Sequence, residues 1–157
     1  MLEDDVASFI AGNVMMIAAT RDGALRAHVG RGCGAYFDAD TGELVLLVSS
    51  SQWPDFFANA RKGGPIAMTV CQPDNYRALQ IKGTIAGVDV ATEVQSAKAS
   101  DYRDRMLAIM DRLGVSRLQL STVFSNVDLA AIRFWPVDLF IQTPGPEAGE
   151  RVQRSQS

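Results

Sequence analysis

The sequence predicts a mainly β domain with flanking helices (an α+β arrangement), whose antiparallel strands close into a small barrel. Two segments, 24–32 and 76–88, alternate apolar with other residues, which is the period of two that half-buried strands show. Asp22-Gly23, just before the first of these segments, is a hairpin turn sequence and predicts antiparallel neighbours. Three closely spaced glycines permit the bulges that curve strands into a barrel: Gly30, Gly32 and Gly34.

Hydrophobic spacing and turn residues also predict the order of the elements. The expected order is a helix over 2–12, strands over 14–20, 24–32 and 43–49, a short helix from Pro54, strands over 65–72 and 76–88, a helix over 92–113, and two strand segments within 129–143 divided at Pro136. The strand over 24–32 is expected to turn Leu25, Ala27 and Val29 to the core and Arg26, His28 and Gly30 away from it. A single domain over 1–142 and a loosely ordered tail over 143–157 complete the prediction.

Composition limits the classes of function. The 157 residues suit one domain with its own core, and the net charge of −3 lacks the basic footprint of a nucleic-acid binder. The start of the chain is acidic and the longest aliphatic run, 44–48, is too short to cross a bilayer. We therefore expect a cytoplasmic protein that binds neither nucleic acid nor membrane. Cys33 and Cys71 lack CxxC spacing and are expected to be small buried thiols.

The chain holds one histidine, His28. A hydrolytic triad would have to use it, but no GxSxG segment is present, and no carboxylate cluster accompanies it for a metal. The sequence therefore identifies no catalytic residue and no metal ligand. If the protein is an enzyme, a cofactor is expected to carry the chemistry.

The junction between the strand over 43–49 and the helix at Pro54 has two interpretations. Its residues are Ser49, Ser50, Ser51, Gln52 and Trp53. The hydroxyls and the free N–H groups of the helix could hold an anion such as phosphate. Alternatively, one serine caps the helix and its neighbours are solvated. Trp53 could stack on a cofactor edge, although a tryptophan here more often packs into a core or a dimer seam.

Three motifs, in this order, make the chain resemble the pyridoxamine 5'-phosphate oxidase-like family, the FMN-binding split β-barrels. "RAHVGR" (26–31) matches the arginine, four mostly apolar residues and lysine of that family, with arginine in place of lysine. "RALQIKG" (77–83) matches its Arg-x-hydrophobic-x-hydrophobic-x-Gly pattern. "IRFWPVDLFIQ" (132–142) is similar to its closing strand.

The resemblance implies a homodimer that binds FMN along its interface and acts as an oxidoreductase on a small molecule. It places the FMN phosphate at basic and hydroxyl side chains, partly at the junction after the third strand. The implied cofactor-binding residues are Arg26, His28, Arg31, Ser49, Ser50, Ser51, Gln52 and Trp53. The oxidases carry Ser-Arg-Lys or similar at this junction, and losing such cations weakens phosphate binding by about 1.5–3 kcal/mol per contact. Oxidation of pyridoxamine phosphate itself is not expected, because the C-terminal tryptophan-and-arginine segment of the oxidases has no clear match.

Two other functions stay open at this point. The missing cations favour a split-barrel dimer that has lost its flavin and serves as a binding or sensing module. His28 could instead bind haem, as haem-degrading relatives of this fold do, and a deazaflavin such as F420 could replace FMN. Arg26 and Arg31 lie an odd number of positions apart, so only a bulge between them would bring both to one face of the strand.

Overall fold

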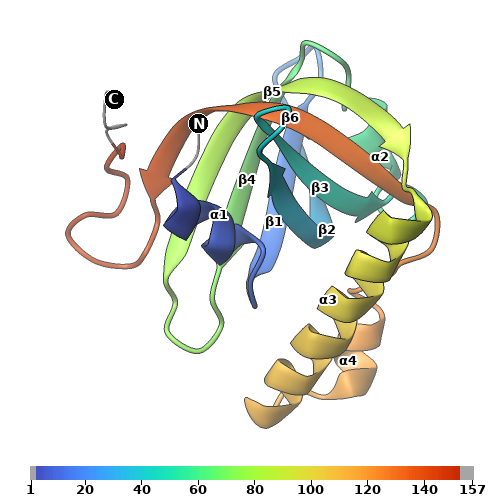
Figure 1. Cartoon of the computed structure of the whole chain (residues 1–157), viewed down its shortest axis with the longest axis vertical. Helices are drawn as coiled ribbons and strands as arrows, with labels where there is room; N and C mark the ends of the chain where they lie inside the picture. The colour runs from blue at the N-terminus through green and yellow to red at the C-terminus, as the bar shows by residue number, and fades with distance from the viewer. Residues whose placement is uncertain (1–2, 153–157) are drawn as a thin grey trace.

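The computed structural model describes residues 3–152 of the chain. Within them, six antiparallel strands close into a barrel in the order β1-β2-β3-β6-β5-β4 (Figure 1). The strands are β1 (Met15–Arg21), β2 (Ala27–Asp38), β3 (Glu43–Ser49), β4 (Pro65–Cys71), β5 (Ala78–Val90) and β6 (Leu129–Ile141). The predicted fold class, an antiparallel barrel with flanking helices, is confirmed.

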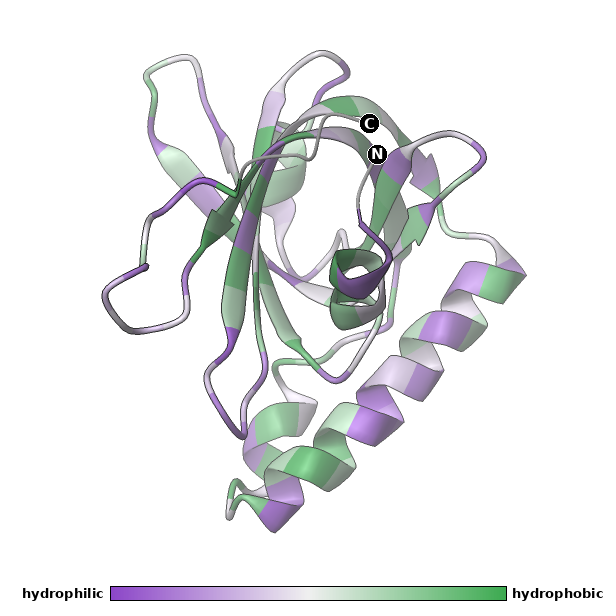
Figure 2. Ribbon diagram, turned by 60° about the vertical axis from the view of Figure 1, so that its left-hand side comes forward, coloured by the Kyte–Doolittle hydropathy of each residue, from purple (hydrophilic) through white to green (hydrophobic). Residues whose placement is uncertain are grey.

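Four helices flank this barrel in the described part of the chain: α1 (Asp4–Ile10), α2 (Pro54–Ala58), α3 (Glu93–Arg112) and α4 (Arg117–Ser121). In Figure 2, α1 lies across one end of the barrel, where Val6, Phe9 and Ile10 are buried. The helix α3 runs past the barrel with α4 beside its far half (Figure 1). No helix of the described residues is long and apolar enough to cross a bilayer.

The prediction of which face of β2 points into the barrel is wrong. Leu25 and Val29 are 70% and 51% exposed, whereas Gly30 and Gly32 face the interior. A Cβ at Gly32 would lie 2.5 Å from Cγ of Met16, and one at Gly30 would lie 3.0 Å from Cγ of Phe56. Side chains from β1 and α2 thus fill the interior beside Gly30 and Gly32, so this half of the strand contributes glycines inward and turns Ala27 and Val29 outward.

The closing strand also differs from expectation, because β6 is one continuous strand rather than two segments divided at Pro136. Pro136 pairs with Gly83 of β5, where the register shifts. A Cβ at Gly83 would collide with the backbone oxygen of Trp135. The glycine of "RALQIKG" therefore lets β5 approach the proline closely, and the ladder continues on both sides of it.

The helices follow the predictions unevenly. The long helix over 92–113 is confirmed by α3, whose N-terminus carries a capping box between Thr92 and Gln95. Leu113 is exposed, since this end of the helix extends past the barrel. The helix from Pro54 is only five residues long, and α4 has no counterpart in the sequence prediction.

Residues 142–152 turn back along the second half of β6. The backbone N–H of Val152 donates to the carbonyl of Leu139 at 2.8 Å, and Arg151 forms an ion pair with Asp138. These contacts cover a strand edge that β3 leaves unpaired, because β3 pairs only with residues 129–134 of β6. The expected looseness of the tail stays a prediction, and its last residues, 153–157, lie outside the described range.

Candidate cofactor site at the turn between β3 and α2

The turn from Ser49 to Trp53 is held by hydrogen bonds within the protein. Ser49 is fully buried, and its Oγ accepts from the backbone N–H of Gln52 at 3.3 Å and lies 3.4 Å from Oγ of Ser51. Ser50 donates to the carbonyl of Asp128 through its N–H at 3.0 Å and its Oγ at 2.9 Å. The turn is thus pinned to the segment that leads into β6.

None of the three serines caps the helix. The N-cap of α2 is Trp53, whose side chain makes no cap hydrogen bond, and the helix has only five residues. Since so short a helix has little macrodipole, an anion at this turn would depend on side chains. Within the turn, Ser51 is the exposed hydroxyl.

Three buried polar atoms lack a hydrogen-bond partner among the described residues: Oε1 of Gln52 and Nε1 of Trp53 in this turn, and Nε of Arg103 in α3. Buried polar groups in native proteins are nearly always satisfied, so an unsatisfied group calls for an explanation such as a bound water or ligand. Two of these atoms belong to the turn itself. The third comes from α3, fifty residues later in the sequence.

One chain segment, residues 122–128, connects the turn with the flank of α3 that carries Arg103. At one end, Nε2 of Gln52 donates to the carbonyl of Thr122 at 2.6 Å. At the other, the amide of Asn126 lies 3.3 Å from the hydroxyl of Ser100, which precedes Arg103 by about one helical turn. The same segment therefore contacts both the turn and the flank of α3 that carries Arg103, and this region is called the seam below.

Arg31 approaches the same seam from β2. Gly32 pairs with Val48 of β3, so Arg31 and Ser49 flank that pair on neighbouring strands. Cys33, which follows on β2, has its Sγ 2.9 Å from the carbonyl of Ser125. Burial raises the pKa of the Cys33 thiol to about 11, against a smaller opposing effect of Arg103. Within residues 3–152, neither Arg31 nor Arg103 forms an ion pair with a carboxylate.

Arg26 and His28 have another partner, Asp22 in the turn between β1 and β2. Nε of Arg26 lies 2.8 Å and Nε2 of His28 lies 3.2 Å from Oδ2 of Asp22. Hydrogen bonds from the backbone of Arg26 and then from His28 hold the pKa of Asp22 well below its usual range. The bulge of β2 lies between Gly32 and Ala35, so it does not bring Arg26 and Arg31 to one face. Their joint role in binding a cofactor stays a prediction.

A bare stretch of sheet adjoins Arg31. The outer surfaces of β2, β1 and β4 present small or apolar side chains: Ala27, Val29, Ile17, Ala19, Ala67 and Thr69. Ile17 is 42% exposed and Val29 51%, although both are apolar strand residues. This surface is called the bare sheet face below. Trp135 is 45% exposed on β6.

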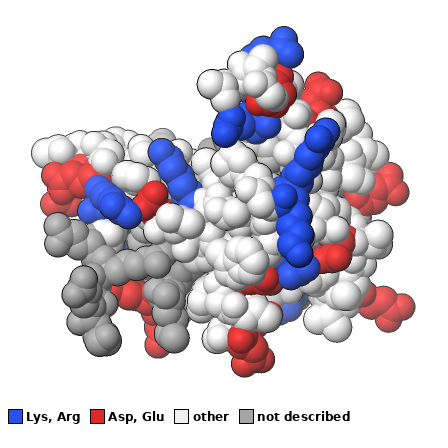
Figure 3. Space-filling view, turned by 90° about the horizontal axis from the view of Figure 1, so that it is seen from above, with Lys and Arg blue, Asp and Glu red and all other residues white. Residues whose placement is uncertain are grey.

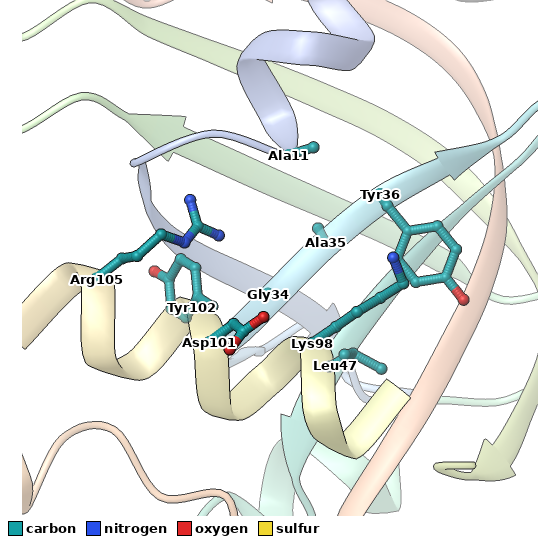
Figure 4. Close-up of a pocket in the computed structure, with 9 residues that line it drawn as sticks. All are labelled: Ala11, Gly34, Ala35, Tyr36, Leu47, Lys98, Asp101, Tyr102 and Arg105. Atoms are coloured by element: carbon teal, nitrogen blue, oxygen red, sulfur yellow. The ribbon is translucent and has the colours of Figure 1, made fainter. Parts of the chain in front are cut away.

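A separate pocket of about 290 Å³ lies on the opposite flank of α3 (Figure 4). Its floor is formed by small residues of β2, Gly34 and Ala35, and its charged groups are Lys98, Asp101 and Arg105 of α3. Nζ of Lys98 stands 5.2 Å from the ring centroid of Tyr36, and Arg105 donates to Asn13 at 2.7 Å. Sequence analysis identified neither this pocket nor Arg103, because both depend on which flanks of α3 meet β2.

Charges elsewhere show no concentration of one sign on the face seen from above the barrel, where acidic and basic side chains are interspersed (Figure 3). Within residues 3–152, no three His, Cys, Asp or Glu side chains gather closely enough to hold a metal ion. The turn between β3 and α2 is therefore the strongest candidate site that the described residues form.

Comparison with known proteins supports the fold. No family model matches the sequence, and no curated protein matches it. Among solved structures, an F420 reductase shares 17% identity and a TM-score of 0.53, covering 88% of this chain and 98% of that one. HupZ of Group A Streptococcus shares 13% identity and a TM-score of 0.55, covering 95% and 100%. A putative pyridoxamine 5'-phosphate oxidase from Lactobacillus delbrueckii shares 15% identity and a TM-score of 0.51, covering 88% and 93%. The chain thus has the split-barrel fold of the pyridoxamine-phosphate-oxidase-like proteins.

Proposed function

We propose that this protein is a flavin-dependent oxidoreductase that binds FMN at the turn between β3 and α2 and acts on a small molecule. The observation that carries the proposal is the seam around this turn. There, two buried polar atoms of the turn lack partners, and Arg31, which has no carboxylate partner among the described residues, stands on the strand next to Ser49. That donor set, in a split barrel similar to an F420 reductase, supports a phosphorylated flavin.

The residues present fit an FMN phosphate. Such a group carries nearly two negative charges at neutral pH and accepts several hydrogen bonds. The hydroxyl of Ser51, the indole N–H of Trp53 and the guanidinium of Arg31 are the donors that would hold it. Nε2 of Gln52 already donates to the carbonyl of Thr122. Gln52 therefore stabilises the turn and is not one of the phosphate donors. When bound, FMN would supply the redox chemistry, while these residues bind and orient it.

The bare sheet face supports the remainder of the proposal, a homodimer. Half-exposed apolar residues such as Ile17 and Val29 leave this face of the barrel without cover from the described chain. A second copy packed there would remove apolar area from water and enclose the flavin ring against β2.

We expect Val29→Lys to shift the protein from dimer to monomer in sedimentation. Val90→Lys, at a position that is 87% exposed on β5, is the matched control. A dimer unaffected by Val29→Lys would place the interface elsewhere.

The test of cofactor binding is spectroscopic. We expect freshly purified protein to show the visible bands of an oxidised flavin, or the apoprotein to quench FMN fluorescence on titration with a rise in melting temperature. Riboflavin, F420 and haem are titrated in parallel under the same conditions. Absence of any response to FMN contradicts the proposal. A response to F420 alone transfers the site to a deazaflavin, and a Soret band lost in His28→Ala transfers the function to haem.

One observation favours a second candidate, a flavin-free binding or sensing module. Ser50 and Gln52 already bond to backbone oxygens, so the turn keeps its shape without a phosphate. Under this alternative, neither FMN nor F420 raises the melting temperature, and the dimer forms in the absence of any flavin.

A further inference from the structure

We propose that Arg103 of α3 supplies the cation that the turn between β3 and α2 lacks, and thereby makes the site select phosphorylated over unphosphorylated flavin. This inference rests on the proposed function and adds to it a residue remote in sequence from the turn. The turn carries no Lys or Arg between Ser49 and Trp53, yet a phosphate dianion there requires positive charge.

The positive charge of Arg103 is not paired with a carboxylate in the described part of the chain. One helical turn away on either side of it, α3 carries Ala99, Ser100, Met106 and Leu107, none of which is acidic. Its Nε is buried and has no hydrogen-bond partner among the described residues. An arginine that only decorates the surface would keep its N–H groups in water.

A comparison within the same helix sharpens this point. Arg105 donates to Oδ1 of Asn13 at 2.7 Å, and Asp101 lies four residues before it. Arg112 donates to the carbonyl of Ala108 at 3.4 Å. These two arginines each donate a hydrogen bond within the described chain, whereas the buried Nε of Arg103 does not. A half-buried guanidinium with an unused donor is the kind of group that binds an oxyanion.

The flank of α3 that carries Arg103 contacts the segment 122–128, and the same segment contacts the turn. Ser100, on that flank, contacts Asn126, and the same segment contacts Gln52 through Thr122. Arg103 also acts electrostatically on Cys33, which lies two residues after Arg31 on β2. In this proposal, Arg31 from β2 and Arg103 from α3 together replace the cations that related oxidases carry within the turn.

The test compares FMN with riboflavin, which has the same ring and lacks the phosphate. Apoprotein is titrated with each flavin, and dissociation constants are read from fluorescence quenching. We expect Arg103→Gln to weaken FMN binding about 10- to 100-fold, the usual effect of one charge-assisted hydrogen bond, and to leave riboflavin unchanged. Arg103→Lys keeps the charge without the planar guanidinium. Its dissociation constant for FMN should lie between those of the unmodified protein and Arg103→Gln. Arg112→Gln, on the same helix, is the matched control and should change neither constant.

The melting temperature of each apo variant shows whether the substitution disturbs the fold. We expect Arg103→Gln to melt close to the unmodified protein, because the substitution breaks no ion pair of the described residues and keeps a polar group at the position of Nε. If Arg103→Gln weakens FMN and riboflavin equally, or weakens neither, the role of Arg103 is wrong while FMN binding stands. If the unmodified protein binds neither flavin, the proposed function fails and the role of Arg103 fails with it.

Discussion

The ion pair between Glu43 of β3 and Arg133 of β6 allows a quantitative test of how the barrel is held closed. Both carboxylate oxygens of Glu43 accept from Nη1 of Arg133, at 3.2 and 2.9 Å, and the Glu43 side chain is only 8% exposed. Asp89 of β5 accepts from Nε of the same arginine at 2.9 Å. One guanidinium thus links three neighbouring strands, and hydrogen bonds to both carboxylates raise the pKa of Arg133.

Replacing the arginine should therefore be costly. In Arg133→Met, the buried carboxylate of Glu43 loses its only side-chain partner among the described residues. Removing one member of a fully buried pair costs about 3–5 kcal/mol. Because Arg133 is itself 38% exposed, solvent screening reduces the expected loss to about 2–3 kcal/mol.

The assay is urea unfolding of four proteins: unmodified, Arg133→Met, Glu43→Gln and the double variant. Glu43→Gln removes the charge that Arg133→Met leaves stranded, so the double variant should be more stable than the sum of the single losses by about 1–2 kcal/mol. A coupling below about 0.5 kcal/mol, the level of an exposed pair, would refute the reasoning. It would show that water already screens this pair in the folded barrel.

Three further predictions concern packing, a buried hydroxyl and pH. Gly32→Ala should destabilise the protein by about 1–3 kcal/mol in urea, since the new methyl group would crowd Met16 inside the barrel; an unchanged midpoint would mean that Met16 moves aside freely. Tyr102→Phe should cost about 1–2 kcal/mol in the same assay. The Tyr102 hydroxyl donates to the carbonyl of Val14 at 2.7 Å, and its removal leaves that carbonyl oxygen without this partner at a buried site. The lowered pKa of Asp22 contributes stability that is present above its unfolded value of about 3.9 and is lost as the pH falls toward the folded value. Asp22→Asn should flatten the dependence of the urea midpoint on pH in that acid range, and an unchanged slope would contradict this assignment.

Much of the fold is readable from local patterns in the sequence. The alternation over 76–88 and the turn at Asp22-Gly23 correspond to β5 and to the turn between β1 and β2. The helix over 92–113 corresponds to α3 within one residue at each end. These features depend on residues close in sequence, so spacing and turn chemistry suffice to predict them.

Sequence patterns failed where a contact from elsewhere decided the outcome. β2 turns Val29 outward because Met16 and Phe56 occupy the space beside its glycines. Pro136 does not divide β6 because Gly83 lets the neighbouring strand come close. In both cases glycine, which carries no side-chain pattern, marks the position where a distant residue packs.

The candidate site divides in the same way. The sequence by itself determined that Ser49 to Trp53 join a buried strand to a helix without any cation, since that is a property of consecutive residues. Only the tertiary structure decided that Ser50 and Gln52 bond to the segment 122–128, that Arg26 pairs with Asp22, and that this segment also contacts α3 through Ser100. The physical reason is that charge and hydrogen-bond partners are set by distance in space, which the spacing of residues along the chain does not determine.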